Sequence, residues 1–454
     1  MWMELRFDLA VIGGGVVGLA ILRRFAMAGL KCVLLEKGAD ILSGASKGNS
    51  ALLHTGFDAP PKSLELRCMK AGYKEYLGIR RKLNLPLIES SAIVVAWTEA
   101  EFEGLPVIVE KARKNGVADV RAISQTELRL KEPNLSRTAL GGVFVPGEHI
   151  IDAWSAPLAY AHQALAHGAT ILRNAEVTDG DFSRDAWTFS SKQGNITASV
   201  AINAAGNFGD LVEMMARLSP FTIKPRKGQF VVFDKPAYKL LRAIILPVPT
   251  IRTKGVVLFR TAFGNLAIGP TAEDQDEREI AACDQDTLKK LKSRAIEMLP
   301  ALETIDVNAT YAGLRPASEH KDYVIEAVKE KNWITVGGIR STGLTASLGI
   351  ADYVSQLYAK NFDKLPKNSP ESIWTPVPNL SEDLIRPYMM AGEIICHCEH
   401  VTRGEIEAAF AGPLPAGDVG GLKRRTRAMM GRCQGFYCSA QIAAITKGHF
   451  DGKP

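Results

Sequence analysis

A glycine pattern close to the start of the chain is the strongest constraint on the fold. Residues 7–12 form an apolar run typical of a buried strand. Three glycines in the spacing G-x-G-x-x-G follow it: Gly13, Gly15 and Gly18. A helical segment comes next, and a second apolar run at 31–35 ends in Glu36. This order of strand, glycine turn, helix, strand and acidic residue predicts a dinucleotide-binding βαβ unit.

Each residue type in this unit has a physical role in holding a dinucleotide. Gly13 permits the tight turn, Gly15 lets the backbone approach a pyrophosphate, and Gly18 lets the helix pack on the strand. The helix N-terminus stabilises phosphate charge through its unpaired N–H groups. Glu36, with Lys37 beside it, is placed to bind a ribose. The pattern alone does not separate NAD from FAD.

The residues after this unit favour a flavin. A third regular βα unit is missing, and the chain instead continues as a loop with small and polar side chains: Ser46, Asn49, Ser50 and His54. Far downstream, an apolar strand leads through Gly338 into a long helix from about Leu344. The N-terminus of that helix can face the flavin pyrimidine edge, which gains charge on reduction. No second G-x-G-x-x-G occurs, which counts against a separate NAD(P)H-binding domain.

Several stretches, in family order, resemble FAD-dependent oxidoreductases of the D-amino-acid-oxidase/glycerol-3-phosphate-dehydrogenase superfamily. They are GNSALLHTGFDAPPKSLELRCMKAG, IDAWSAPLAYAHQALAHGATI, VAINAAGNFGD, PRKGQFVVFDK, GNLAIGPTAED and YAGLRPAS. The first is most similar to the branch of glycerol-3-phosphate dehydrogenases and oxidases and L-2-hydroxyglutarate dehydrogenases. The resemblance covers residues 7 to about 360 and implies FAD as cofactor.

The expected fold is α/β, or α+β overall: a Rossmann-like FAD-binding domain, a β-sheet substrate cap and a small helical C-terminal domain. The FAD-binding domain is expected to be discontinuous and to comprise residues 1–80, 145–220 and 310–360. The cap would comprise 81–144 and 221–310. A linker rich in Pro, Asn and Ser at 361–388 leads to the last domain at 389–454.

The resemblance also implies the residues of the active site. His54 is expected to be the base for a substrate hydroxyl, which suits a group that titrates near neutral pH. Arg315, at the end of a strand, is expected to clamp a substrate anion, with Lys254 as a second anion contact. The alternatives are a structural histidine, a structural ion pair and a solvated lysine. Further flavin contacts are expected at Val177, Ala205, Gly206, Ser341, Thr342, Gly343 and Thr345.

Four of the seven cysteines lie in the last sixty residues, at Cys396, Cys398, Cys433 and Cys438. Two thiolate pairs suit either Zn²⁺ or an iron–sulfur cluster. A flavin upstream takes up two electrons together, so a one-electron carrier in the same chain favours iron and sulfide. The segment also resembles the bacterioferritin-associated-ferredoxin-type module at the C-terminus of the anaerobic glycerol-3-phosphate dehydrogenase large subunit, which implies a [2Fe-2S] cluster. His397 and His400 are not needed as ligands.

A basic run lies between the cysteine pairs, at Lys423, Arg424, Arg425 and Arg427. An oxidised [2Fe-2S] cluster with four thiolates carries a charge of about −2. We expect the run to offset this charge and raise the reduction potential. The run is alternatively a solvated helix face or a docking patch for a partner, and these roles do not exclude the first.

Composition narrows the class of protein. The net charge of +6 on 454 residues and the absence of a basic, aromatic-rich stripe argue against nucleic acid binding. No run approaches a membrane span, and no signal peptide is evident. A cytoplasmic protein is expected, with peripheral membrane association allowed.

The resemblance implies oxidation of a small anionic secondary alcohol, foremost sn-glycerol 3-phosphate. Electrons would pass through FAD and the cluster to a partner subunit or quinone. One alternative is an L-2-hydroxyglutarate or other 2-hydroxy-acid dehydrogenase. Another is an amine, opine or hydroxyproline dehydrogenase subunit. A non-enzymatic electron-transfer or scaffold subunit is a further alternative, against which the presence of both His54 and Arg315 speaks.

Overall fold

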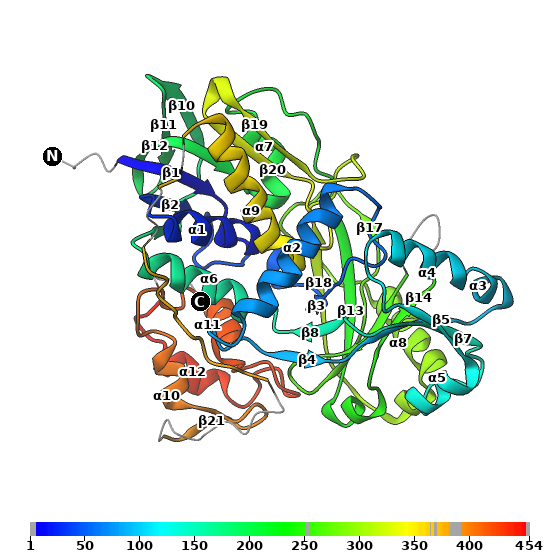
Figure 1. The fold of residues 1–454 in the computed structure, drawn as a ribbon. Helices are drawn as coiled ribbons and strands as arrows, with labels where there is room; N and C mark the ends of the chain where they lie inside the picture. The colour runs from blue at the N-terminus through cyan, green and yellow to red at the C-terminus, as the bar shows by residue number, and fades with distance from the viewer. Residues whose placement is uncertain (1–5, 250–254, 364, 367–369, 382–391, 451–454) are drawn as a thin grey trace.

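A computed structural model describes residues 6–249, 255–363, 365–366, 370–381 and 392–450. These residues form two large sheets with their helices and a small C-terminal domain, which lies below the first sheet in Figure 1. Within the described residues, no helix is both long and apolar enough to cross a membrane.

The first sheet is the expected Rossmann-like layer. Its parallel core has the order β9 (Thr170–Leu172), β2 (Cys32–Leu35), β1 (Arg6–Ile12), β12 (Gly194–Asn203) and β20 (Trp333–Gly337). The edges are antiparallel: β10 (Asp179–Ser183), β11 (Ala186–Ser191) and β19 (Val324–Val328). The fully buried residues of β2 fit the near-continuous apolar runs of a parallel sheet covered on both faces.

One layer of helices covers this sheet. α1 (Val16–Met27) packs between α6 (Ser155–Ala166) and α9 (Gly343–Asn361), and α9 also packs on α2 (Leu64–Ile79). The α2–α9 crossing is close enough to require glycine, because a Cβ on Gly72 would lie 2.1 Å from the carbonyl oxygen of Thr345. This contact holds the N-terminus of α9 at the end of the first sheet (Figure 1).

The second sheet forms the cap. Its strands, in spatial order, are β17 (Glu273–Asp274), β13 (Arg226–Phe233), β16 (Leu266–Gly269), β15 (Val257–Arg260), β14 (Ile244–Pro247), β5 (Ala92–Ala96), β7 (Gly141–Val145) and β6 (Arg121–Ser124). The long strand β18 (Val307–Arg315) pairs with β13 and continues past residue 310, where the boundary was expected. The helices of this part are α3 (Glu99–Glu103), α4 (Leu105–Lys114), α5 (Gln125–Lys131) and α8 (Gln285–Met298).

A small three-stranded sheet joins the two layers. β8 (His149–Ile151) pairs with β3 (Leu52–Leu53) on one side and with β4 (Leu87–Glu89) on the other. Leu53 lies opposite His149 in the register. The sheet therefore brings residue 54 and residue 148, far apart in sequence, to one place.

The C-terminal domain contains β21 (Ile394–Cys396), β22 (Val401–Thr402), α10 (Arg403–Ala408), α11 (Val419–Thr426) and α12 (Ser439–Ile445). Helix α11 packs on the loop after β2. Arg425 donates to both carboxylate oxygens of Asp40, and Arg424 donates to the carbonyl oxygen of Ile41 at 2.9 Å. Part of the basic run therefore docks the domain onto the flavin side, rather than facing the cysteines as the charge argument expected.

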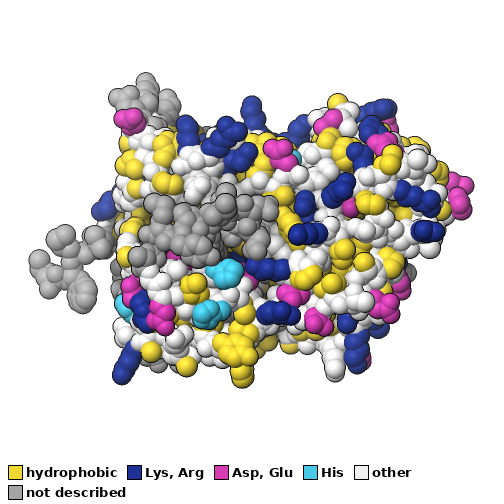
Figure 2. Space-filling view, turned by 90° about the horizontal axis from the view of Figure 1, so that it is seen from below, with side chains coloured by type: hydrophobic (Ala, Val, Ile, Leu, Met, Phe, Trp, Pro, Cys, Tyr) yellow, Lys and Arg dark blue, Asp and Glu magenta, His cyan; other side chains and the backbone are white. Residues whose placement is uncertain are grey.

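The chain between α9 and β21 carries no regular element among its described residues and lies along the first layer. Ile373 is hydrogen-bonded to Gln163 and His167, and Val377 is hydrogen-bonded to Leu83. Residues 382–391, which comprise the end of the expected linker and the first residues of the expected last domain, lie outside the described residues. Seen from below, basic and acidic side chains are interspersed across the face shown (Figure 2).

Candidate functional site: a flavin cavity and four cysteines

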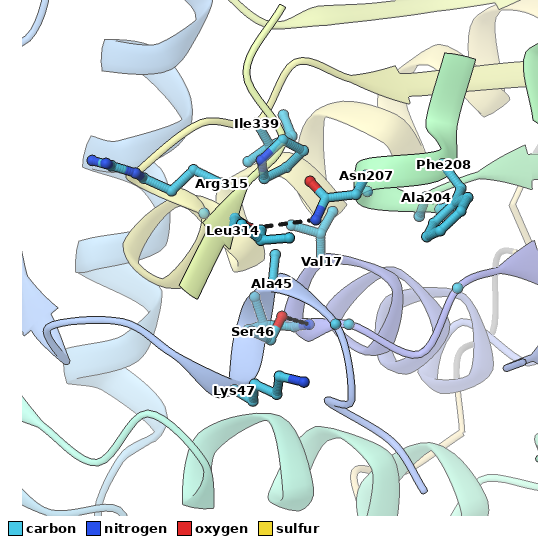
Figure 3. Close-up of a pocket in the computed structure, with 18 of the residues that line it drawn as sticks. Val17, Ala45, Ser46, Lys47, Ala204, Asn207, Phe208, Leu314, Arg315 and Ile339 are labelled. Atoms are coloured by element: carbon cyan, nitrogen blue, oxygen red, sulfur yellow. Dashed lines mark hydrogen bonds between the residues drawn. The ribbon is translucent and has the colours of Figure 1, made fainter. Parts of the chain in front are cut away.

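A cavity of about 460 Å³ lies where the strands of the first sheet end against the cap. Its walls include the last residues of β1, β2 and β20 on one side and residues of β13 and β18 on the other. Figure 3 shows side chains from the first layer, such as Val17 and Ser46, facing Leu314 and Ile339 across it. Ligands of open α/β sheets bind at this carboxyl edge.

The glycine turn forms the floor of the cavity. Gly13 has a φ of +111°, and a Cβ on it would lie 2.5 Å from the carbonyl oxygen of Ala204. A Cβ on Gly18 would lie 2.0 Å from the carbonyl oxygen of Gly13, so Gly18 serves helix packing and does not line the cavity. At the start of α1, the N–H of Val16 donates to the hydroxyl of Ser46 at 3.0 Å.

Glu36 lies at the end of β2 with its carboxylate buried beside the turn. One of its oxygens accepts the N–H of Gly14 at 2.7 Å, and the other accepts the N–H of Gly38 at 2.7 Å. Lys37 forms an ion pair with Glu279, and its ammonium lies 3.7 Å from the ring centroid of Phe208. These contacts close the end of the cavity expected to hold a ribose.

Most of the residues expected to contact flavin line this cavity. They are Gly13, Gly15, Glu36, Lys37, Ser46, Asn49, Ser50, Val177, Ala205, Gly206, Gly338, Ser341, Gly343 and Leu344. Gly18, Thr342 and Thr345 are absent from its lining. The hydroxyl of Thr342 donates to Glu65 at 2.8 Å, and that of Thr345 accepts the N–H of His54 at 3.1 Å. Both hydroxyls fix the start of α9 against neighbouring segments.

His54, the expected base, is held by a buried carboxylate. Its Nδ1 atom lies 2.6 Å from Glu148, whose side chain is 1% exposed. The second oxygen of Glu148 accepts the N–H of Thr55 at 2.7 Å and its hydroxyl at 2.8 Å. This pairing fixes the orientation of the imidazole, and His54 itself is not among the residues that line the cavity.

Arg315 lies at the end of β18 on the cavity wall, and Figure 3 shows its side chain extending away from Asn207 and Phe208. Its guanidinium donates to the carbonyl oxygens of Thr271, Lys227 and Arg226. In the described part of the chain, no carboxylate forms an ion pair with it. Burial lowers the pKa of Arg315 to about 10, because a desolvated cation is disfavoured.

A largely buried guanidinium held by neutral acceptors has the chemistry to bind an anion. The second expected anion contact, Lys254, lies outside the described residues.

The four cysteines come together at the core of the C-terminal domain. The thiols of Cys398 and Cys433 interact, as do those of Cys396 and Cys438. Burial raises the pKa of Cys438 to about 11, and the neighbouring Cys396 adds to the rise. Gly431 is in close contact, because a Cβ there would lie 2.2 Å from that of Cys398. Among the described residues, no group of three or more His, Cys, Asp or Glu side chains is arranged so that it could hold a metal ion.

Some residues of the site were not predicted from the sequence. Glu148 faces His54 through the β3–β8 pairing. Asn207 and Arg278 line the cavity, and Asn207 bonds to the carbonyl oxygens of Arg278 and Leu314 at 3.3 and 3.5 Å. The acidic residue in the stretch PGEHI was the one available signal for Glu148. That Glu148 contacts His54 becomes evident only from the pairing of β8 with β3.

Fold and site together define a flavoprotein with an attached thiolate centre. Residues 8–357 match the family described as FAD dependent oxidoreductase, DAO, and residues 394–447 match the BFD-like [2Fe-2S] binding domain. The chain therefore belongs to the DAO family of FAD-dependent oxidoreductases, with a [2Fe-2S] domain at its C-terminus. The expected family, fold and cofactors are confirmed, and the zinc alternative is set aside.

Relatives with known names are similar over most of the chain. A glycerol 3-phosphate dehydrogenase from Caloramator mitchellensis is 32% identical over 451 residues, which is 97% of this chain and 93% of that protein. An L-2-hydroxyglutarate dehydrogenase from Escherichia coli K12 is 27% identical over 60% of this chain and 65% of its own. The solved L-alpha-glycerophosphate oxidase of Mycoplasma pneumoniae, with FAD bound, has a TM-score of 0.76 at 26% identity, covering 83% of this chain and 99% of its own.

The residues present fit both cofactors. For FAD, a glycine turn stands at a helix N-terminus with the buried carboxylate of Glu36 beside it, and the cavity runs on to Arg315. For the cluster, four thiols form two interacting pairs, as two tetrahedral iron ions with two protein ligands each require.

Proposed function

We propose that this chain oxidises sn-glycerol 3-phosphate to dihydroxyacetone phosphate and sends the electrons through FAD and the [2Fe-2S] cluster to an acceptor outside the chain. The observation that carries the proposal is the largely buried guanidinium of Arg315 on the cavity wall, whose hydrogen bonds to described residues all go to backbone carbonyl oxygens. A substrate with a phosphate or carboxylate would supply the missing counter-charge. The names of the similar dehydrogenase and oxidases favour the phosphate.

In this mechanism Arg315 binds and orients the anionic end of the substrate. His54 takes the proton of the hydroxyl group, while the carboxylate of Glu148 holds Nδ1 and stabilises the positive charge that the ring gains. FAD, when bound, would supply the hydride acceptor for the carbinol carbon. The hydrogen bonds of Thr55 keep Glu148 oriented toward the ring.

Four thiolates from Cys396, Cys398, Cys433 and Cys438 would hold the cluster, which supplies one-electron transfer when present. The acceptor beyond the cluster is a partner subunit or a quinone. A cytoplasmic location, with peripheral contact to a membrane where a quinone is the acceptor, fits this scheme.

The test is anaerobic bleaching of the flavin absorbance by a panel of substrates. Glycerol 3-phosphate is expected to bleach the flavin fast, whereas L-2-hydroxyglutarate, hydroxyproline and an opine are not. Fast bleaching by L-2-hydroxyglutarate instead would assign the 2-hydroxy-acid activity, since Arg315 can bind a carboxylate as well as a phosphate. Bleaching by none of the panel would reject the enzymatic proposal.

A further inference from the structure

Arg427 joins the C-terminal domain to both other parts of the molecule. Its guanidinium donates to Glu399 at 3.2 Å from both Nε and Nη2, and it lies 3.9 Å from the ring centroid of Phe263 in the cap. Its charge also acts on Asp152 of the flavin layer: burial raises the pKa of Asp152, and the positive charge of Arg427 opposes that rise. With 5% of its side chain exposed, Arg427 is enclosed by the three parts.

Two aromatic rings, Phe263 and Trp154, connect Arg427 with the lining of the flavin cavity. The ring of Phe263 stacks on Trp154 with centroids 5.5 Å apart and planes at 14°. The indole N–H of Trp154 donates to the carbonyl oxygen of Lys47 at 3.2 Å. Lys47 is part of the cavity lining and is labelled in Figure 3.

The contacts that run from Lys47 through Trp154, Phe263 and Arg427 end at Glu399, beside the cysteines. Glu399 follows Cys398 directly in the chain, and Gly431 is packed against both: a Cβ on Gly431 would lie 2.2 Å from the Cβ of Cys398 and 3.2 Å from Cγ of Glu399. Two more ion pairs hold this end to the cap, Arg432 with Asp234 at 3.0 Å and Lys235 with Glu399 at 3.7 Å. The contacts from Lys47 to Cys398 are therefore continuous and firmly held.

We propose that electrons leave the flavin cavity for the cluster along this series, past Lys47, Trp154, Phe263, Arg427 and Glu399. The inference rests on the proposed transfer from FAD to the [2Fe-2S] cluster and adds its route. The side chains supply a packed medium and keep the two cofactors at a fixed separation; none of them is itself oxidised or reduced. They are positioning residues.

The electron count of the step is simple. One electron leaves the two-electron-reduced flavin, and one ferric ion of the cluster becomes ferrous. The second electron follows after the cluster has passed the first to a quinone or an electron-transfer protein, and the proton carried by the reduced flavin is released to solvent.

The experiment separates flavin reduction from cluster reduction. Holoprotein is mixed anaerobically with glycerol 3-phosphate; flavin absorbance is followed by stopped flow, and the reduced cluster by EPR of freeze-quenched samples. Trp154→Leu and Phe263→Leu are expected to slow cluster reduction several-fold. Flavin bleaching, iron and flavin content and both reduction potentials are expected to stay at parental values. Trp154→Phe, which keeps an aromatic ring, is the matched control and is expected to transfer near the parental rate.

Parental rates of cluster reduction in both leucine variants would overturn the route. Should Trp154→Leu lose its flavin, Phe263→Leu carries the test, since the hydrogen bond to the cavity residue Lys47 comes from Trp154. If glycerol 3-phosphate fails to bleach the parent protein, the proposed substrate is wrong and the route is still tested. A laser flash with EDTA as donor then reduces the flavin, and the same variants are compared.

Discussion

The guanidinium of Arg425 lies 3.0 Å from Oδ1 of Asp40, and the two residues are 385 positions apart in the chain. The carboxylate is fully buried, and 8% of the Arg425 side chain is exposed. Arg173 adds a second cation 3.7 Å from the same carboxylate. Because Asp40 comes four residues after Glu36, one loop both contributes to the flavin cavity and docks the [2Fe-2S] domain.

Removal of the buried carboxylate is expected to weaken that docking. Asp40→Ala leaves the buried Arg425 and the partly buried Arg173 without their counter-charge, and breaking a buried pair costs about 3–5 kcal/mol. We expect earlier release of the C-terminal domain in limited proteolysis and a lower unfolding midpoint in urea. The control is Asp286→Ala, in an exposed pair with Lys289, which is expected to shift stability by less than about 1 kcal/mol. An Asp40→Ala protein as resistant as the parent would contradict this role.

The pairing of Glu148 with His54 yields a second prediction. Glu148→Gln removes the charge that stabilises a protonated imidazole, so the rate of flavin reduction by substrate is expected to fall by about 10²-fold or more. Substrate affinity, measured from the dependence of that rate on concentration, should change little. Thr55→Val is the matched control, because it keeps the charge of Glu148 and deletes one hydrogen bond to it. Equal rates in Glu148→Gln and the parent would remove Glu148 from the mechanism.

The parts of the site that could be predicted from the sequence lie within short, continuous segments of the chain. Gly13, Gly15 and Glu36 belong to one βαβ unit whose geometry is fixed by about thirty residues, so their spacing alone indicates a dinucleotide. The cysteines likewise form two short motifs. The family resemblance extended this reasoning to Ser341 and Leu344, which line the same cavity from the far end of the domain.

Contacts between distant segments could not be predicted in this way. Glu148 reaches His54 because β8 pairs with β3, and no local pattern sets that register. The basic run was interpreted through the cluster charge, yet Arg424 and Arg425 contact the loop at Ile41 and Asp40. The charge of an arginine predicts that it will contact an anion or another acceptor. The fold determines which acceptor lies within reach.

The buried guanidinium of Arg315 is expected to make the protein's stability depend on anions. Burial of a cation lowers its pKa and costs folding free energy, and a bound anion restores the balance. Glycerol 3-phosphate at one hundred times its dissociation constant should stabilise the parent by about 2.7 kcal/mol. Arg315→Gln should lose most of this gain while its ligand-free stability is equal or higher. Differential scanning fluorimetry with glycerol 3-phosphate and with uncharged glycerol measures both, and an undiminished shift in Arg315→Gln would exclude Arg315 as the anion site.

Two glycine-to-alanine changes test the geometry of the docked domain. A Cβ on Gly421 in α11 would lie 1.6 Å from Oδ2 of Asp40, whereas a Cβ on Gly78 in α2 meets nothing within 4 Å. Alanine in a helix interior is favoured over glycine by about 0.5–1 kcal/mol, so Gly78→Ala should raise the unfolding free energy by that amount. Gly421→Ala has the same intrinsic preference but must push α11 off the loop, so it should expose the C-terminal domain to proteolysis and leave the flavin layer folded. If Gly421→Ala were as protease-resistant as Gly78→Ala, α11 would not be seated on Asp40 in solution.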